Sequence, residues 1–345
     1  MKNLRLIHLV VALLFKVLAF SPVSWAQVTK LNVSYSSESP GALPVWIAKE
    51  AGLYAKNGLD VQLIRVTGNV AVMALVSGEV SIGLMGGSAI ITSNLGGSDA
   101  VMVAAGQVST DYALVSRATI KSAEQLKGGI FGVASHIGSA MTATQYALQK
   151  LGLNPNKDLT IIVVGGTPER LIALRTGRIH ATLLSPPTSF AAQKDGFNIL
   201  VDVVGLPLPY NSLATTRKFI REHPDTLRKF IKSHVEAVHL LKTDRETGIK
   251  VLGKYLRRTR DRELLERSYD LSVADGILPR KQYPTLAGIK TVLESLVGMQ
   301  PKASTAKAED FVEMRFIKEL ERAAISTSFI KGRKSKEATN GSRDF

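Results

Sequence analysis

Over the first two thirds of the chain, short runs of β-branched and apolar residues alternate with longer segments in which apolar residues recur every third or fourth position. The short runs predict strands and the longer segments predict helices. The predicted strands are Leu31–Tyr35, Val61–Val66, Val80–Leu84, Val101–Ala105, Ala113–Ser116, Ile130–Val133, Thr160–Val164, Ala181–Leu184 and Asn198–Val203. The predicted helices are Pro44–Lys56, Val70–Ser77, Ser88–Leu95, Ser122–Leu126, Ser139–Leu151 and Thr167–Thr176. This alternation predicts βαβ units that build mainly parallel sheets.

The last third of the chain shows helical periodicity alone, beginning at Arg217. One face of a predicted helix there carries the apolar residues Leu227, Phe230, Ile231, Val235, Val238 and Leu241. Two further amphipathic helices are predicted in "TLAGIKTVLESLVG" and "DFVEMRFIKELERAA". Residues 331–345, "KGRKSKEATNGSRDF", have almost no apolar content, and we expect them to form a disordered basic tail.

Two stretches in different parts of the chain share one design. "ALVSGEVSIGLMGGS" (74–88) and "ALRTGRIHATLLSPP" (173–187) each contain a helix end, a Ser-Gly or Thr-Gly stop, and an apolar strand that runs into a loop of small residues. Gly78 and Gly177 fit the left-handed position that ends many helices. The shared pattern predicts two lobes of similar construction.

The first 26 residues have the pattern of a secretory signal peptide, with Lys2 and Arg5 before an apolar run that only Lys16 interrupts. The run is shorter than the roughly 20 apolar residues of a membrane-spanning helix, so we expect cleavage after Ala26 rather than an anchor. The chain has no cysteine, which excludes a disulfide framework, thiolate catalysis and a lipid-modified cysteine. These features predict a free protein in the periplasm.

The net charge of +15 is unevenly distributed along the chain. Fourteen basic and six acidic residues lie between Arg217 and Arg262, a surplus of eight positive charges in one helical region. Such a surplus is typical of a solvated helix face, and attraction to an anionic membrane surface or to nucleic acid is the alternative. We expect no nucleic-acid partner, because no aromatic residues interleave with these charges.

Each predicted lobe contains a strand that is followed by Gly-Ser and the start of a helix. The pairs are Gly87-Ser88 and Gly138-Ser139. A helix start presents unpaired N–H groups and the positive end of the helix dipole, and glycine allows close approach of the backbone to a ligand. If both starts face one cleft, they would bind an anion well. The alternative is that each serine only caps its helix.

With these features the chain resembles the periplasmic solute-binding proteins of ABC importers, in the sulfonate, nitrate and taurine group. That group also includes proteins that bind or make the thiamine pyrimidine. The phrases that carry the resemblance are "LPVWIAKEAGLYAKNGLDVQLI", "ALVSGEVSIGLMG", "LKGGIFGVASHIGSAMT", "ALRTGRIHATLLSPP" and "FIREHPDTLRKFIKSHVEA". They span roughly Leu31 to Ala237, and the first two are the most specific.

The resemblance implies an α/β fold of the type II periplasmic binding proteins, with two α/β lobes joined by two crossover strands and a helical C-terminal region. Lobe I would comprise residues 27–115 and 213–330, and lobe II residues 116–212. The expected crossovers are "YALVSRATI" (112–120) and "NSLATTRKF" (211–219). The two lobes of such proteins close around a ligand by a hinge motion.

Ligands of open α/β sheets bind beyond the carboxyl ends of the strands, and we chose candidate residues in those loops. The candidates are Ser37, Ser39, Trp46, Gly87, Ser88, Gln107, Ser135, Gly138, Ser139, Thr167, Ser185, Tyr210 and Asn211. For Trp46, packing in the core is the favoured alternative, because aromatic side chains are usually buried. The loops are rich in Ser, Thr and Gly and hold Glu38 as their only acid, so we expect a sulfonate, a carboxylate or a similar oxyanion as ligand. The alternative is an uncharged aromatic pyrimidine, which the resemblance also allows and which Trp46 and Tyr210 could contact.

The sequence contains none of the motifs of nucleophile elbows, zinc proteases or phosphate loops, and we expect no enzymatic activity, no cofactor and no metal. The resemblance implies a receptor that acts as a monomer and delivers its ligand to an ABC permease in the inner membrane. A sensory binding protein that docks on a receptor remains an alternative. A pyrimidine-synthesis enzyme of the related branch is disfavoured, because that branch uses a cysteine-rich stretch.

Overall fold

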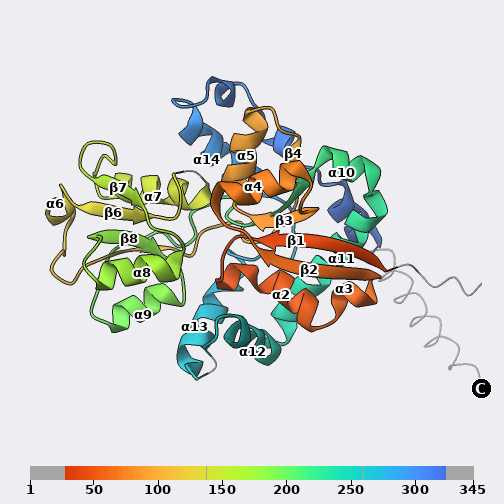
Figure 1. The fold of residues 1–345 in the computed structure, drawn as a ribbon, viewed down its shortest axis with the longest axis horizontal. Helices are drawn as coiled ribbons and strands as arrows, with labels where there is room; N and C mark the ends of the chain where they lie inside the picture. The colour runs from red at the N-terminus through yellow and green to blue at the C-terminus, as the bar shows by residue number, and fades with distance from the viewer. Residues whose placement is uncertain (1–27, 137, 259, 324–345) are drawn as a thin grey trace, which may run out of the picture.

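The computed structural model describes residues 28–136, 138–258 and 260–323, so the predicted signal peptide and basic tail lie outside the described ranges. Two lobes lie side by side, and each is built on one five-stranded sheet (Figure 1). Within the described ranges, no helix is long and apolar enough to cross a membrane.

The first lobe contains a sheet with the strand order β2-β1-β3-β10-β4. Its strands are β1 (Thr29–Tyr35), β2 (Leu59–Arg65), β3 (Ile82–Met85), β4 (Ala100–Ala105) and β10 (Ser212–Thr216). Strand β1 pairs in parallel with β2 and β3, whereas β10 runs antiparallel between β3 and β4. The chain therefore returns to this sheet only after it has formed the second lobe, and β10 takes a place between β3 and β4.

The second lobe repeats this topology with the strand order β7-β6-β8-β5-β9. Its strands are β5 (Ala113–Ser116), β6 (Ile130–Val133), β7 (Thr160–Val163), β8 (Ala181–Leu184) and β9 (Asn198–Asp202). Strands β3 and β8, which belong to the two similar sequence stretches, occupy equivalent places in the two sheets. The prediction of two lobes of similar construction is confirmed.

The prediction of mainly parallel sheets is wrong, because each sheet is mixed. In the second sheet β5 runs antiparallel to both β8 and β9, as β10 does to its neighbours in the first. The cause is that the chain crosses between the lobes twice. The strand after each crossing, β5 or β10, enters its sheet from the hinge side and therefore runs opposite to its neighbours. Half of the strand pairs are therefore antiparallel, although the βαβ units around β1 and β6 are parallel.

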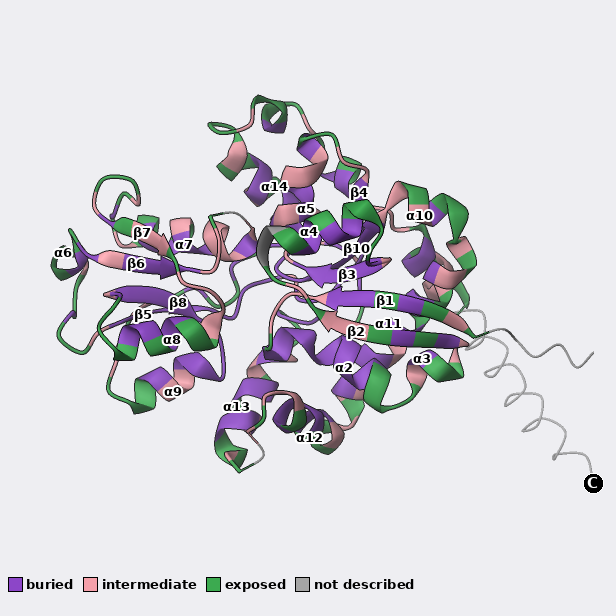
Figure 2. Cartoon of the chain, in the orientation of Figure 1, coloured by how far each residue is buried: buried purple, intermediate pink, exposed green. Residues whose placement is uncertain are grey.

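Helices cover both sheets, and the buried strands lie between helices that are exposed on one face (Figure 2). The α-helices are α2 (Leu43–Glu50), α3 (Leu53–Lys56), α4 (Gly68–Ser77), α5 (Gly87–Leu95), α6 (Ala123–Leu126), α7 (Ser139–Lys150), α8 (Thr167–Arg175), α9 (Thr188–Lys194), α10 (Arg217–Glu222), α11 (Pro224–Thr243), α12 (Arg245–Tyr255), α13 (Arg262–Ser272) and α14 (Leu286–Leu296). Short 3-10 helices are η1 (Pro40–Ala42), η2 (Pro301–Ser304) and η3 (Ala308–Phe311). The single helix predicted over residues 44–56 is divided into α2 and α3, because Gly52 has a left-handed φ of 67°.

Two antiparallel segments, residues 106–112 and 203–211, connect the lobes. Gly106 N–H donates to the Asn211 carbonyl at 2.8 Å, and Leu208 N–H donates to the Val108 carbonyl at 3.1 Å. The crossovers expected at 112–120 and 211–219 begin where the connecting segments end, because β5 already starts at Ala113 and β10 at Ser212. Strands β5 and β10 begin directly after the connecting segments, so only residues 106–112 and 203–211 bridge the lobes.

The C-terminal region holds this two-stranded hinge against the first lobe. Val108 N–H donates to the Ile277 carbonyl at 2.8 Å, and Ser109 Oγ donates to the Gly276 carbonyl at 2.7 Å. On the other side α14 approaches the second crossover so closely that a Cβ added at Gly288 would lie 2.9 Å from the Leu208 backbone. Helices α11 and α12 pack on α2, which places the C-terminal helices with the first lobe (Figure 1).

The hydrophobic core has one cluster inside each lobe and a third that continues across the boundary between them. The continuous cluster joins Met85 and Ile90 of the first lobe to Val133 and Ala143 of the second, with Leu208 of the crossover between them. Removing apolar surface from water contributes about 25 cal/mol for each Å². The two lobes of this conformation are therefore held together by apolar burial as well as by the hinge.

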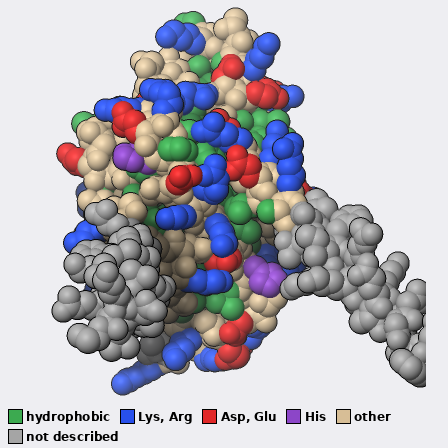
Figure 3. Space-filling model, turned by 90° about the vertical axis from the view of Figure 1, so that its right-hand side faces the viewer, with side chains coloured by type: hydrophobic (Ala, Val, Ile, Leu, Met, Phe, Trp, Pro, Cys, Tyr) green, Lys and Arg blue, Asp and Glu red, His purple; other side chains and the backbone are tan. Residues whose placement is uncertain are grey.

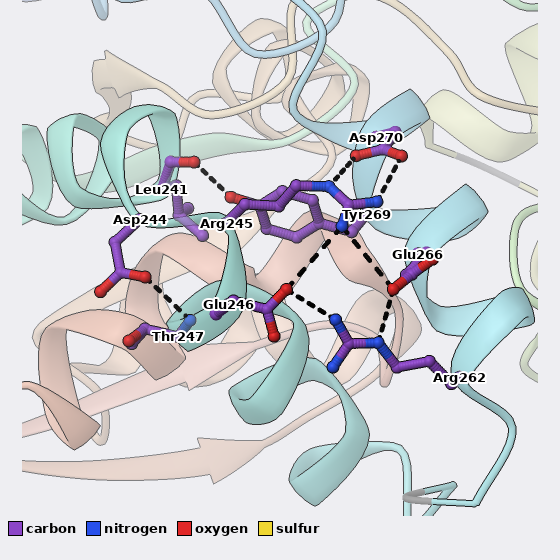
Figure 4. Close-up of polar contacts among 9 residues, drawn as sticks. All are labelled: Leu241, Asp244, Arg245, Glu246, Thr247, Arg262, Glu266, Tyr269 and Asp270. Atoms are coloured by element: carbon purple, nitrogen blue, oxygen red, sulfur yellow. Dashed lines mark hydrogen bonds and ion pairs between the residues drawn. The ribbon is translucent and has the colours of Figure 1, made fainter.

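The basic residues of the helical region lie on solvated faces and many meet acids from outside the counted stretch. Arg245 contacts Asp270 at 2.8 Å and Glu266 at 3.7 Å, and Arg262 contacts Glu266 at 2.5 Å (Figure 4). The face that carries α3 and α10 likewise shows acidic side chains among the basic ones (Figure 3). Ion pairs of this exposed kind contribute roughly 0–1 kcal/mol each, so they balance charge more than they stabilise.

Candidate functional site

A pocket of about 190 Å³ lies between the lobes at the carboxyl ends of the strands, next to the hinge. The first lobe contributes the loop after β1, the start of α4 and the loop between β3 and α5. The second lobe contributes the loops before α7 and α8 and the end of β8. Tyr112, Tyr210 and Asn211 of the two crossovers line the side nearest the hinge.

Most of the candidate residues chosen from the sequence line this pocket. They come from both lobes and from the second crossover, and they are Ser37, Ser135, Gly138, Ser139, Thr167, Ser185, Tyr210 and Asn211. Their convergence follows from the shared direction of the strands that precede them. Their contacts with a ligand remain predictions.

The remaining candidates lie outside the pocket, and the structure gives each a different place. Ser39 lines an adjacent hollow of about 50 Å³ and bonds to Ser37, with 2.8 Å between the two Oγ atoms. Trp46 is fully buried in the first lobe and stacks on Tyr255 with 4.5 Å between ring centroids. Its indole therefore belongs to the core rather than to a binding surface.

Gln107 is also structural, because it ties the two crossovers together. Its Oε1 accepts a hydrogen bond from Asn211 Nδ2 at 3.0 Å, and its Nε2 donates to the Ser272 carbonyl at 3.4 Å. The side chain is buried and does not line the pocket. It holds Asn211, which does line the pocket, in place.

The two predicted helix starts do face each other across the lobes, but they use part of their polar groups on one another. Ser88 Oγ and Ser139 Oγ are 3.2 Å apart, and Ser139 Oγ donates to the Pro209 carbonyl at 3.2 Å. The Gly87 N–H donates to that same carbonyl at 2.7 Å, so it is not available to a ligand. Gly87 and Ser88 therefore lie outside the pocket lining, whereas Gly138 and Ser139 at the start of α7 line the pocket.

The sequence analysis missed Arg170, which is the only cationic side chain lining the pocket among the described residues. Arg170 lies in α8 and is 2% exposed. Its Nη2 donates to Thr167 Oγ1 at 3.3 Å, and its Nε donates to the Gly166 carbonyl at 3.4 Å. Within the described part of the chain no carboxylate pairs with Arg170, since the neighbouring Glu169 contacts Arg65 instead, at 3.9 Å.

A signal for Arg170 was present in the helical pattern. Thr167, Arg170, Leu171 and Leu174 occupy positions i, i+3, i+4 and i+7 of one helix, and this spacing defines the buried face. An arginine at such a position, in the first turn after a Gly-Gly loop, is either paired in the core or directed into a pocket. The other arginine of this helix, Arg175, lies on the outer face and pairs with Asp195.

The two tyrosines beside Arg170 remain neutral hydrogen-bonding groups at physiological pH. Burial raises the pKa of the Tyr112 hydroxyl, and the positive charge of Arg170 opposes this only in part. Burial raises the pKa of the Tyr210 hydroxyl well above its usual range, and the neighbouring Asp111 adds to the effect. The rings meet edge to face with 5.1 Å between centroids, a favourable geometry for an aromatic pair.

Replacing Gly138 by alanine is expected to lower both stability and ligand affinity. Gly138 has φ of +93° and ψ of 175°, a region that residues with a side chain populate at a cost of about 1–3 kcal/mol. No atom lies within 4 Å of an added Cβ, so backbone strain in the pocket loop causes the loss and not steric blockage. Urea unfolding and titration calorimetry measure the two effects.

Gly128→Ala is the matched control, because Gly128 has a φ of +76° in the same lobe and does not line the pocket. It should lower stability without changing affinity. Wild-type stability and affinity in Gly138→Ala would contradict the structural role assigned to this glycine.

Comparisons with known proteins identify relatives of both the sequence and the fold. The sequence model of a family described as NMT1-like matches residues 26–252. A protein of Bacillus subtilis named as binding protein YtlA is 26% identical over 218 residues, which are 61% of this chain and 65% of that protein. A protein of Brachyspira hyodysenteriae named as an ABC transporter periplasmic binding protein is 28% identical over 145 residues, 42% of this chain and 41% of that protein.

The match therefore spans less than two thirds of the length of either relative. Among solved structures, the alkanesulfonate-binding protein SsuA of Xanthomonas axonopodis bound to MOPS superimposes with a TM-score of 0.68. The sequences are 19% identical, and the superposition covers 83% of this chain and 98% of that structure. At this identity the likeness shows the fold alone, and that fold is the one the sequence predicted.

Proposed function

The chain belongs to the NMT1-like family, and from that premise we propose that it is the solute-binding receptor of an ABC importer that captures a small anionic ligand between its lobes. The single observation that supports an anionic ligand is the environment of Arg170. This buried cation lines the pocket and has no acidic partner in the described part of the chain. Burying an unpaired charge is costly, and an anionic ligand would supply the missing partner. The planar guanidinium also matches the geometry of a carboxylate or a sulfonate-like oxyanion.

The rest of the lining supports the same ligand class. No Asp or Glu is among the described residues that line the pocket, whereas the hydroxyl groups of Ser37, Ser135 and Thr167 are. Val72, Met85 and Ala89 give the first-lobe side an apolar surface. A small organic oxyanion with a short apolar part fits this division, with its charged end toward α8.

Contacts across the lobes support capture by closure, the established motion of periplasmic binding proteins. Arg65 of the first lobe lies 3.9 Å from Glu169 of the second, and the Arg267 guanidinium lies over the Phe190 ring at 4.4 Å. None of these four side chains lines the pocket, and the Arg65–Glu169 pair lies beside the pocket-lining Gly166. We propose that the closed form, in a periplasmic monomer without turnover of its ligand, delivers the solute to the permease.

A thermal-shift panel tests the proposal on ligand-free protein, with alkanesulfonates, short carboxylates, nitrate and neutral pyrimidines in buffers that contain no sulfonate. A ligand at 100 times its Kd stabilises by about 2.7 kcal/mol, which corresponds to a shift of several degrees. We expect a shift with at least one oxyanion and recovery of that ligand unchanged by mass spectrometry. A shift with neutral pyrimidines alone, or a chemically altered ligand, would overturn the proposal.

A further inference from the structure

The side-chain amide of Asn211 is held in one orientation by hydrogen bonds that lie behind the pocket. Gln107 Nε2 donates to the Ser272 carbonyl at 3.4 Å, and a carbonyl oxygen can only accept. The oxygen of the Gln107 amide is therefore the atom that faces Asn211. This oxygen accepts a hydrogen bond from Asn211 Nδ2 at 3.0 Å, so the nitrogen of the Asn211 amide is directed to Gln107.

The other atom of this amide, Asn211 Oδ1, is directed toward the pocket. Asn211 is 8% exposed and lines the pocket, whereas Gln107 and Gly41, which lie next to its Nδ2, do not line it. Gly41 packs so closely on this side that an added Cβ would clash with both Asn211 Nδ2 and Gln107 Oε1. The nitrogen therefore points away from the pocket, and it cannot change places with the oxygen while Gln107 accepts from it.

Asn211 Oδ1 is an acceptor that the protein leaves for a ligand. No described residue donates a hydrogen bond to it, and the described polar atoms that are enclosed without a partner do not include it. The oxygen is therefore accessible from the pocket that Asn211 lines. When a ligand expels water from the pocket, an acceptor without a donor costs free energy. The pocket therefore favours a ligand that carries a hydrogen-bond donor as well as the negative charge that Arg170 attracts.

The donor that fits this pocket best is uncharged. No Asp or Glu is among the described residues that line the pocket, so the protein would offer an ammonium group a neutral acceptor and no counter-charge. Burying a charge in that way is costly, whereas a hydroxyl group donates one proton and needs no counter-charge. Asn211 directly precedes β10 of the first lobe and Arg170 lies in α8 of the second, so a ligand that contacts both bridges the lobes.

We propose that Asn211 Oδ1 accepts a hydrogen bond from a hydroxyl group of the ligand, and that Gln107 is the positioning residue that sets this specificity from outside the pocket. The inference rests on the function proposed above, capture of a small oxyanion, and narrows the ligand class to hydroxycarboxylates and hydroxyalkanesulfonates. A ligand with a methyl group in place of the hydroxyl leaves Oδ1 buried without a donor. The hydroxylated compound should therefore bind roughly 5- to 150-fold more tightly than its methyl isostere.

Titration calorimetry of the wild-type protein with matched compounds tests the proposal without any mutation. Three sets share one design, in which a hydroxyl, a methyl or an oxo group occupies position 2 of propanoate, position 3 of butanoate or position 2 of propane-1-sulfonate. The hydroxyl donates and accepts, the methyl does neither, and the oxo group only accepts. Each enantiomer of the hydroxyl compounds is measured, and the corresponding amino compounds probe a charged donor. In at least one set we expect the hydroxyl compound to bind most tightly, ahead of the methyl, oxo and amino compounds.

Variants assign the preference to its residues. Gln107→Met removes the acceptor behind the pocket and keeps a side chain of similar length, so the Asn211 amide can turn and offer its N–H groups to an oxo ligand. The ratio of the oxo Kd to the hydroxyl Kd should then fall several-fold, whereas lost packing alone would weaken both compounds equally. Asn211→Leu should abolish the preference for hydroxyl over methyl. Gln193→Met changes an exposed glutamine of α9 outside the pocket and should retain the wild-type ratios.

The outcomes separate the two proposals. If no oxyanion of either panel binds, the proposed function fails and the hydroxyl specificity fails with it. If an oxyanion binds but no hydroxyl compound is preferred over its methyl and oxo counterparts, the receptor stands and the role of Asn211 is wrong. Tighter binding of an amino compound overturns the uncharged donor. An unchanged ratio in folded Gln107→Met, or a preference for hydroxyl that persists in Asn211→Leu, contradicts the assignment to these residues.

Discussion

Replacing Arg170 by glutamine is expected to weaken oxyanion binding by roughly 30- to 5,000-fold. Loss of one partner of a buried, hydrogen-bonded charge pair costs about 2–5 kcal/mol, since the other charge is left without compensation. The free energy of unfolding of the ligand-free protein should fall by much less than the binding free energy. The variant removes a buried cation that has no acidic partner in the described part of the chain. Titration calorimetry gives the Kd, and thermal melts without ligand give the stability.

Arg175→Gln is the matched control for this experiment. Arg175 lies in the same helix, its side chain is 46% exposed, and it pairs with Asp195 at the surface. We expect less than a twofold change in Kd. Arg170→Lys should fall between wild type and glutamine, because it keeps the charge but loses the forked geometry. An unchanged Kd in Arg170→Gln would remove the observation on which the anionic ligand rests.

Replacing Trp46 by alanine is expected to lower the free energy of unfolding by about 3–5 kcal/mol, the range for large aromatic side chains removed from a core. The side chain is fully buried, stacks on Tyr255 and meets Tyr35 edge to face with 5.8 Å between centroids. Its removal leaves a cavity that the surrounding strands and helices fill only in part. Because Trp46 does not line the pocket, the Kd of the folded fraction should stay unchanged.

Urea unfolding measures the loss, and calorimetry below the unfolding transition measures the Kd. Ile172→Ala serves as the surface control, because Ile172 is 57% exposed on α8 and should change stability by less than about 0.5 kcal/mol. A large loss of affinity in folded Trp46→Ala, with little loss of stability, would contradict the core role and indicate that Trp46 contacts the ligand.

Local patterns were sufficient to predict the elements and the general location of the site. Apolar periodicity records which face of a segment is buried, so the strands around β1 and β6 and their helices could be placed without the structure. The loop residues Ser37, Thr167 and Ser185 could be proposed because strands of one direction end at one edge. The two similar stretches around β3 and β8 predicted the repeated lobe, since the same helix-stop and strand signals recur.

The sequence by itself determined the two-lobed α/β architecture, whereas only the tertiary structure decided which polar groups are free to meet a ligand. A helix start looks the same whether its amide faces a pocket or, like Gly87, already donates to the Pro209 carbonyl. The partners that decide such questions are distant in the chain, as with Gln107 and Asn211, which are 104 positions apart. Arg170 likewise lines the pocket together with Tyr112 of the first crossover, and the cost of a buried charge is set by such surroundings and not by its neighbours in sequence.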